Sequence, residues 1–265
     1  MSSTTAAPDQ DELDLGEIPE RLGDVEAERR RRKQQLAAAF RVFGRYGYDE
    51  GVAGHITVRD PHLVDHFWVN PFAVHFSRMR VRDLLLIDGQ GKVVEGTGRT
   101  NKAAFHIHAA IHEARPDAVA VAHAHTIHGR AFSTLSRELL PIVQESCAFY
   151  RDHVVFDEYK GLVVERDESV RIAQRLGPRR AVILRHHGLI TVGGSVEETA
   201  WWFISMDRAC QMQLLAQAAG TPRVMTDEEA TLARRQFGNP NMARHNFRQL
   251  SSLVLDQEPD VLDED

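Results

Sequence analysis

The chain has 265 residues, a formal net charge of −6, and hydrophobic and charged fractions of 43% and 26%. This length and balance suit an ordinary globular protein with a substantial core, and the negative charge argues against nucleic-acid binding. No apolar run approaches the roughly 18 residues that cross a bilayer, and the N-terminus lacks a signal-peptide pattern. Two cysteines do not make a disulfide framework. We therefore expect a cytoplasmic protein that binds neither membrane nor nucleic acid.

The composition of the chain divides it into three parts. Residues 1–26 are rich in Ser, Thr, Pro, Asp and Glu and contain no aromatic residue, which predicts a disordered tail. Residues 27–250 form the predicted folded domain. Residues 251–265 end in a short acidic stretch, from Asp256 onward, that we interpret as a second tail without fixed structure.

The first half of the domain predicts one helix, several closely spaced strands and a second helix. Leu36, Phe40 and Phe43 follow the basic run 29–33 at helical spacing. Strands are predicted at 56–58, 67–69, 84–87 and 93–94, with a hairpin turn at 88–91. A helix then runs from about residue 100 to 114, where Pro116 stops it.

The second half continues with strands at 118–125, 181–184 and 189–192. Ser195 and Glu198 make a capping-box pattern that predicts a long helix to about Ala219, before Gly220 and Pro222. Strands and helices alternate in this way in α/β or α+β proteins, in which helices pack on a central sheet.

A pair of histidines in the strand 118–125 is the strongest chemical signal. His123 and His125 alternate with small alanines. Residues two apart on a strand project from the same face, so both imidazoles can reach one ion. Neutral imidazole suits Zn, Fe, Co, Ni or Mn. The alternative interpretation of the pair alone is that both histidines are packed structural residues or lie at the surface.

A third ligand has to come from another segment, and His187 is the best candidate. It lies between two apolar strands, next to His186 and Gly188, and the glycine lets backbone approach closely. Adjacent histidines on a strand face opposite ways, so only one of the two should bind. His108 and His112, one helical turn apart, are an alternative source of ligands.

Three motifs in order resemble the class II aldolase/adducin family. They are Gly54-His55-Ile56-Thr57-Val58-Arg59, then Arg115-Pro116-Asp117 ahead of His123-Ala124-His125, and then His187-Gly188. The similarity extends from about residue 29 to 219. It implies a three-layer α/β/α fold with a central, mainly antiparallel sheet and a homotetramer with sites between subunits. It also implies that one divalent ion is held by His123, His125 and His187.

The chain departs from the sugar-phosphate aldolases of that family where they handle phosphate and protons. Their catalytic glutamate, 19 residues before the first histidine of the pair, is Ala104 here. Their phosphate serines fall on Lys102 and Ala103, and their glycine-containing phosphate loop falls on residues 70–73, which lack glycine. Their tyrosine acid falls near Glu145. The resemblance therefore implies a metal site without the phosphate site or the aldol proton-transfer group.

This combination favours decarboxylation over aldol cleavage. Loss of CO2 leaves a carbanion that a Lewis-acidic ion can stabilise, whereas aldol chemistry needs a placed acid/base group. We predict a metal-dependent carbon–carbon lyase that decarboxylates a small 2-oxo, 2-hydroxy or aromatic hydroxy acid with Zn or Fe(II), or else Mn or Co. Similar chains include decarboxylases and the non-haem iron oxygenases of aminocoumarin antibiotic pathways. An Fe(II) oxygenase carrying out oxidative decarboxylation is therefore the second hypothesis, and a non-catalytic adducin-like module is the third.

Six further residues are candidates for the remaining groups of the site. A carboxylic acid substrate needs a cationic or hydrogen-bonding partner, and proton transfer needs a titratable group. Each candidate is alternatively a structural or surface residue. The catalytic candidates are Glu145, His55 and Tyr150, and the substrate-binding candidates are Arg59, Lys102 and His75.

Overall fold

The computed structural model describes residues 16–161 and 166–264. Most of the predicted N-terminal tail, residues 1–15, lies outside the described residues, as do the side chains of residues 102–104. No helix in the described ranges is long and apolar enough to span a membrane.

An eight-stranded sheet forms the centre of the protein, in the order β4-β3-β2-β1-β5-β8-β7-β6. Neighbouring strands are antiparallel throughout, except for the parallel pair β6 and β7. Every strand predicted from the sequence is present, and β6 is an additional one. The strands are β1 (His55–Arg59), β2 (Phe67–Val69), β3 (Leu85–Ile87), β4 (Val93–Glu95), β5 (Ala120–Ala124), β6 (His153–Phe156), β7 (Ala181–Leu184) and β8 (Gly188–Gly193).

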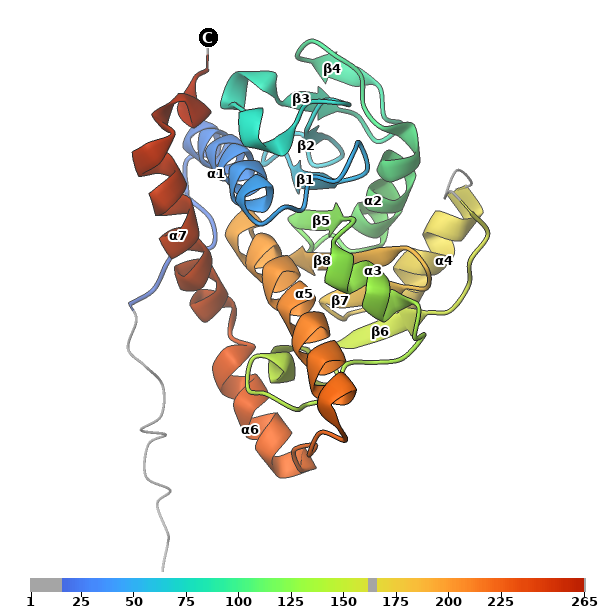
Figure 1. Ribbon diagram of the computed structural model, residues 1–265. Helices are drawn as coiled ribbons and strands as arrows, with labels where there is room; N and C mark the ends of the chain where they lie inside the picture. The colour runs from blue at the N-terminus through green and yellow to red at the C-terminus, as the bar shows by residue number, and fades with distance from the viewer. Residues whose placement is uncertain (1–15, 162–165, 265) are drawn as a thin grey trace, which may run out of the picture.

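Helices cover both faces of this sheet and make the three predicted layers (Figure 1). One face carries a large apolar core under α1 (Val25–Arg45), α3 (Ile127–Ser133), α5 (Val196–Ala219) and α7 (Pro240–Gln257). The other face carries a smaller core under α2 (Lys102–Ala114) and α4 (Arg166–Leu176). The remaining α-helix, α6 (Asp227–Phe237), packs on the short 3-10 helix η3 (Ser146–Phe149). The predicted α/β/α architecture is confirmed.

Side-chain caps begin the two longest helices. Asp24 accepts a hydrogen bond from Ala27 N at the start of α1, and the predicted Leu36, Phe40 and Phe43 are fully buried below it. Ser195 accepts from Glu198 N at the start of α5, as predicted. In a capping box the Glu198 carboxylate would accept from Ser195 N. Here it accepts from Gly194 N instead.

The prediction of a C-terminal tail without fixed structure is wrong. The chain continues in α7 to Gln257 and then in η4 (Pro259–Leu262), where Val261 is fully buried. The acidic side chains are ordered because Glu258 and Asp260 form ion pairs with Arg41 of α1 at 2.8 and 2.9 Å. The described part of the N-terminal segment is also packed, with Ile18 buried and its N–H donating to Asn241.

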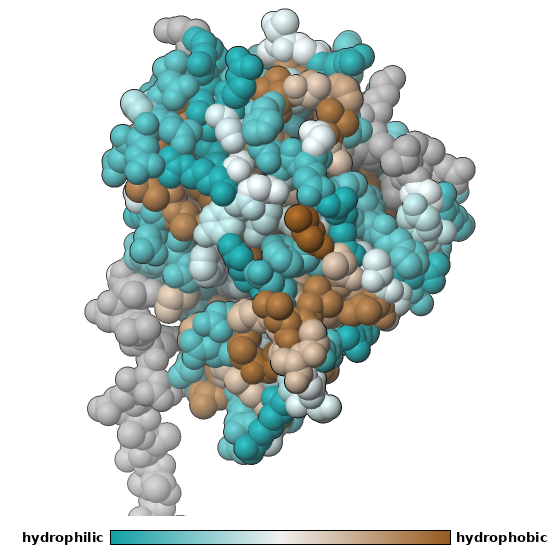
Figure 2. Space-filling model, in the orientation of Figure 1, coloured by the Kyte–Doolittle hydropathy of each residue, from teal (hydrophilic) through white to brown (hydrophobic). Residues whose placement is uncertain are grey.

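The face of the protein seen in Figure 1 exposes an apolar patch. Figure 2 shows apolar residues gathered below α3 and over the end of α5. The exposed large apolar side chains here are Ile127 on α3, Leu135 in the segment directly after α3, and Leu215 on α5. A patch of this kind is a common feature of protein–protein contact surfaces.

Candidate metal centre

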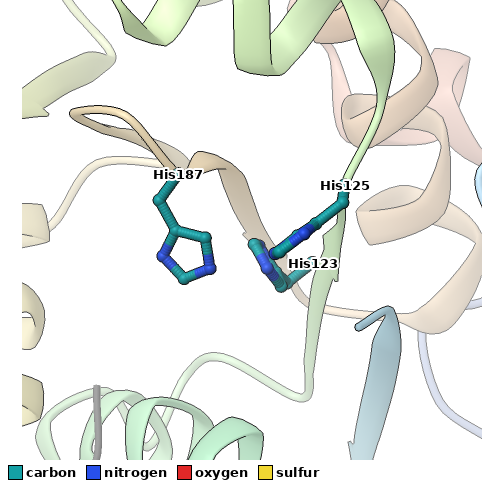
Figure 3. A group of neighbouring side chains, drawn as sticks. All are labelled: His123, His125 and His187. Carbon is teal, nitrogen blue, oxygen red and sulfur yellow. The ribbon is translucent and has the colours of Figure 1, made fainter. Parts of the chain in front are cut away.

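Three histidines converge where β5 ends and β8 begins. His123 belongs to β5, His125 follows the end of that strand, and His187 lies in the turn between β7 and β8. Because β5 and β8 are paired antiparallel, the end of β5 and the start of β8 lie together. One ligand atom from each histidine lies within 4.8 Å of the others, and Figure 3 shows the three side chains around a common space.

The β7–β8 turn selects His187 over His186. His186 adopts a left-handed backbone, with φ of 57°, and its exposed ring lies against Tyr159, 5.6 Å between centroids. Gly188 has φ of 153°, and a Cβ there would lie 3.5 Å from Ala124 O and 3.7 Å from the His123 ring. A larger residue would be strained by this backbone conformation, although a Cβ would make only ordinary contacts with these neighbours. The turn explains why one of the two adjacent histidines joins the group.

The protonation of the three rings suits a metal ion. The Nδ1 atom of His123 lies 2.8 Å from Leu189 O, so Nδ1 carries the proton and Nε2 is a free lone pair. Burial lowers the pKa of all three histidines, to about 4 for His187. They are therefore neutral near pH 7, as nitrogen ligands must be. Three such ligands fit a divalent ion and leave coordination positions for a substrate.

Three further histidines lie beside the group, on the α2 face of the sheet, and Thr57 links two of them by hydrogen bonds. The His55 ring lies 5.1 Å from that of His123 and 4.2 Å from that of His108. The Thr57 hydroxyl lies 2.7 Å from His108 Nδ1 and 2.9 Å from His112 Nε2. His108 and His112 thus contact Thr57. The alternative in which they supply metal ligands is not supported, since only the triad forms a metal-type group among the described residues.

Arg130 adjoins the triad, and the sequence analysis missed it. It lies on α3, which begins directly after His125, and it pairs with Glu50. After burial, its positive charge is the largest cause that lowers the pKa of His125. The buried Asp207 holds the start of α3 by accepting from Gly129 N at 3.0 Å. One sequence signal could have identified Arg130: it lies in a helix that starts directly after a His-x-His strand.

Two of the predicted substrate-binding residues have other partners. Arg59 lies at the end of β1 away from His55 and donates to the carbonyl oxygens of Val64 and, at 2.7 Å, His112. His75 is exposed and pairs with Asp49 at 3.0 Å. The structure does not bring either to the triad. The side chain of Lys102 lies outside the described residues.

Of the predicted catalytic residues, only His55 lies beside the triad within the chain. Glu145 is exposed and accepts from Gln144 at 3.1 Å. The Tyr150 hydroxyl donates to Asp227, at the start of α6. Both flank η3, and Tyr150 packs against α6.

The three-layer fold and the triad define an α/β protein with a candidate divalent-metal site. Residues 34–214 match the sequence model of the Class II Aldolase and Adducin N-terminal domain. The chain belongs to the class II aldolase/adducin family, as its motifs predicted.

Two relatives and one solved structure illustrate the similarity. "Decarboxylase NovR" of Streptomyces niveus is 46% identical over 231 residues, 86% of each chain. The "4-hydroxy-3-prenylphenylpyruvate oxygenase/4-hydroxy-3-prenylbenzoate synthase" of Streptomyces roseochromogenus subsp. oscitans is 45% identical over 231 residues, 86% of this chain and 83% of the relative. The structure of "L-fuculose 1-phosphate aldolase from Glaciozyma antarctica PI12" is 37% identical with a TM-score of 0.86, over 93% of this chain and 97% of that one.

Proposed function

We propose that the protein is a divalent-metal-dependent carbon–carbon lyase that decarboxylates a small aromatic 2-oxo or 2-hydroxy acid. The observation that carries this proposal is the set of three neutral histidines whose ligand atoms lie within 4.8 Å of one another. The guanidinium of Arg130 lies nearby. The 46% identity to a protein named as a decarboxylase supports the same reaction type. The absence of the aldolase glutamate at Ala104 supports a reaction without removal of a C–H proton.

Each residue of the centre has a proposed role. His123, His125 and His187 hold the ion, Zn or Fe(II) in the first instance, with Mn or Co as alternatives. When bound, such an ion supplies Lewis-acid stabilisation of negative charge on substrate oxygens. Arg130, fixed by its ion pair with Glu50, binds the substrate carboxylate by charge-assisted hydrogen bonds. The bond from His123 Nδ1 to Leu189 O keeps its ring in the ligating orientation.

We further propose a cytoplasmic homotetramer, on the basis of the family resemblance. The exposed apolar patch of α3 and α5 supports an assembly. In it, Glu145 and Tyr150 would serve the triad of a neighbouring chain, because in their own chain Glu145 is exposed and Tyr150 donates to Asp227 of α6.

An Fe(II)-dependent oxygenase is the second candidate function. The 45% identity to a protein named as an oxygenase favours it, and three imidazoles are suitable ligands for Fe(II). A non-catalytic adducin-like module is the third candidate, and the complete histidine triad argues against it.

Metal analysis followed by gas measurements tests these functions. The protein is purified without chelators or added metal, its metal content is measured, and 4-hydroxyphenylpyruvate and 4-hydroxymandelate are supplied. Release of CO2 without O2 uptake is the expected result. One O2 consumed for each CO2 would instead establish the oxygenase. Stoichiometric metal without either gas change, across these and other aromatic acids, would contradict both enzyme functions.

A further inference from the structure

The carboxylate of Asp207, on α5, bonds to two segments that lie beside the metal centre. Its Oδ1 atom accepts from Gly129 N at 3.0 Å, in the first turn of α3. Its Oδ2 atom accepts from the Tyr48 hydroxyl at 3.2 Å, in the segment between α1 and β1, and lies 3.3 Å from His128 Nδ1. Asp207 is only 1% exposed. These polar groups therefore compensate for the burial of its charge.

The bond to Gly129 connects Asp207 to a tightly packed turn. A Cβ at Gly129 would lie 2.6 Å from Thr126 Oγ1 and 2.8 Å from the Leu189 side chain, so this turn packs closely on β8. Thr126 begins the helix, and its Oγ1 also accepts from Gly129 N, at 3.2 Å. The next residue in the chain is Arg130. The Gly129 N–H therefore connects the buried carboxylate to the turn from which Arg130 extends.

The bond to Tyr48 connects Asp207 to the segment that contains Glu50. The Tyr48 ring packs edge-on against Phe43 of α1, with 5.4 Å between centroids, and against Phe203 of α5 at 5.7 Å. Burial, and then the charge of Asp207, raises the pKa of Tyr48, so its hydroxyl stays protonated and donates. Glu50 is two residues further along the chain. The bond therefore fixes the base of the segment from which Glu50 extends.

Arg130 joins these two segments at the metal centre, because its guanidinium pairs with Glu50. A Cβ at Gly188 would lie 4.0 Å from Arg130 Cγ and 3.7 Å from the His123 ring, which places the arginine stem beside the triad. Asp207 thus bonds to both sides of this ion pair, one residue before Arg130 and two residues before Glu50.

The ion pair alone is too weak to hold Arg130 in one place. The side chains of Arg130 and Glu50 are 41% and 42% exposed. Water screens an exposed pair of this kind, so its net contribution is small. Hydrogen bonds to the buried carboxylate of Asp207 are stronger, because they involve a charged acceptor and water does not compete for them. The position of Arg130 therefore depends mainly on Asp207.

We propose that Asp207 is a positioning residue, which sets where Arg130 lies relative to the metal centre. It acts through its buried hydrogen bonds to Gly129 N and the Tyr48 hydroxyl, and it does not touch the substrate. Arg130 can bind a carboxylate at the metal centre only if its guanidinium stays beside the triad, a contact that rests on the proposed function. Loss of the two bonds should weaken carboxylate binding and leave the three histidine ligands in place.

Calorimetry with benzoate, an unreactive aromatic carboxylate, tests this assignment on the metal-loaded protein. Asp207→Leu removes both acceptors and should raise the Kd for benzoate at least about tenfold. Asp207→Asn keeps an acceptor for Gly129 N and a polar partner for Tyr48, so its Kd should stay within about twofold of the wild type. Gln213→Leu is the matched control and should leave the Kd unchanged. It removes another buried acceptor of α5, which bonds to Leu140 N at 2.7 Å.

A double-mutant cycle with Arg130→Gln separates positioning from a general loss of stability. Arg130→Gln should itself raise the Kd at least about tenfold. In that background Asp207→Leu should have no further effect, because it acts through the missing guanidinium. A general structural defect would instead raise the Kd by the same factor in both backgrounds. If Asp207→Leu does not fold, Tyr48→Phe takes its place in the cycle, with an expected rise of about threefold.

Metal content and circular dichroism of each variant show whether the triad and the fold are retained. The assignment would be overturned by wild-type protein that does not bind benzoate, an unchanged Kd in Asp207→Leu, equal losses in Asp207→Asn and Asp207→Leu, or an additive cycle. Benzoate binding does not depend on turnover. The expected Kd pattern without CO2 release from aromatic acids would refute the proposed decarboxylation only. CO2 release with an unchanged Kd in Asp207→Leu would refute the positioning role only.

Discussion

His55 lies directly opposite His123 across the pairing of β1 with β5, with 5.1 Å between their ring centroids. Both rings donate Nδ1–H to a backbone carbonyl, His55 to Ala53 and His123 to Leu189. The backbone therefore fixes both tautomers, and each ring presents Nε2. For His123 this atom is available to an ion, and for His55 it is buried without a hydrogen-bond partner among the described residues.

Removal of a triad histidine should abolish stoichiometric metal. His123→Ala, His125→Ala and His187→Ala each delete one of three ligands, so we expect less than about a tenth of the wild-type metal content by elemental analysis. Circular dichroism should show that the fold is retained. Full metal occupancy in His187→Ala would show that another residue, such as His186, supplies the third ligand.

Loss of the Arg130 charge should weaken substrate binding and leave the ion in place. A charge-assisted hydrogen bond contributes about 1.5–3 kcal/mol, so Arg130→Gln should raise KM for an aromatic 2-oxo acid by roughly 10- to 150-fold. Arg137→Gln, at an exposed position after α3, is the matched control and should leave KM unchanged. A wild-type KM in Arg130→Gln would exclude the proposed contact with the carboxylate.

His112 should make the stability of the fold fall in acid. Its pKa is about 3 in the folded protein because of burial, against about 6.5 in an unfolded chain. Above pH 6.5 both states hold the ring neutral, so it has no effect there. Between pH 6.5 and 3 only the unfolded state binds the proton, so the free energy of unfolding falls by about 1.4 kcal/mol per pH unit.

Denaturant unfolding between pH 4 and 7 measures this contribution. The slope of stability against pH should be smaller in His112→Gln by about one proton. The control is Ile111→Val on the same helix, a buried apolar residue, which should lower stability equally at each pH. Identical slopes in the wild type and His112→Gln would show that His112 does not titrate in this way.

The protein should not cleave sugar phosphates. The Phe72 N–H that could approach a phosphate is already bonded to Arg99 O, and Ala104 replaces the aldolase glutamate. A missing general base typically costs about 10²–10⁴-fold in rate. We therefore expect turnover of fuculose 1-phosphate and ribulose phosphates at least that far below a sugar-phosphate aldolase assayed in parallel. Comparable rates would restore the aldolase assignment.

Local patterns predicted most of the sheet and the convergence of the three histidines. His123 and His125 were found because strand alternation places them on one face, and His187 because a glycine marks the adjacent turn. β6 was missed because His153–Phe156 is a short run without alternation. The ordered C-terminal end around η4 was missed because Glu258 and Asp260 look solvated until their partner Arg41 in α1 is known.

The other groups of the site depend on contacts that no local pattern contains. Arg59 shares a motif with His55, but four residues of strand separate them by roughly 13 Å, so it cannot serve the same ion. Arg130 reaches the triad only because Asp207, on α5, positions α3. The tautomer of His55 depends on the Ala53 carbonyl that its ring faces, and no sequence pattern shows this contact.

The ion pairs of Arg41 have a consequence for synthesis. Their partners Glu258 and Asp260 are 217 and 219 residues further along the chain. During translation α1 leaves the ribosome early, and its buried arginine lacks these carboxylates until the last helix emerges. Such distant contacts slow folding, and incomplete chains expose surfaces that aggregate. Nascent chains halted before residue 258 should therefore engage chaperones, whereas release of the full-length chain should free them.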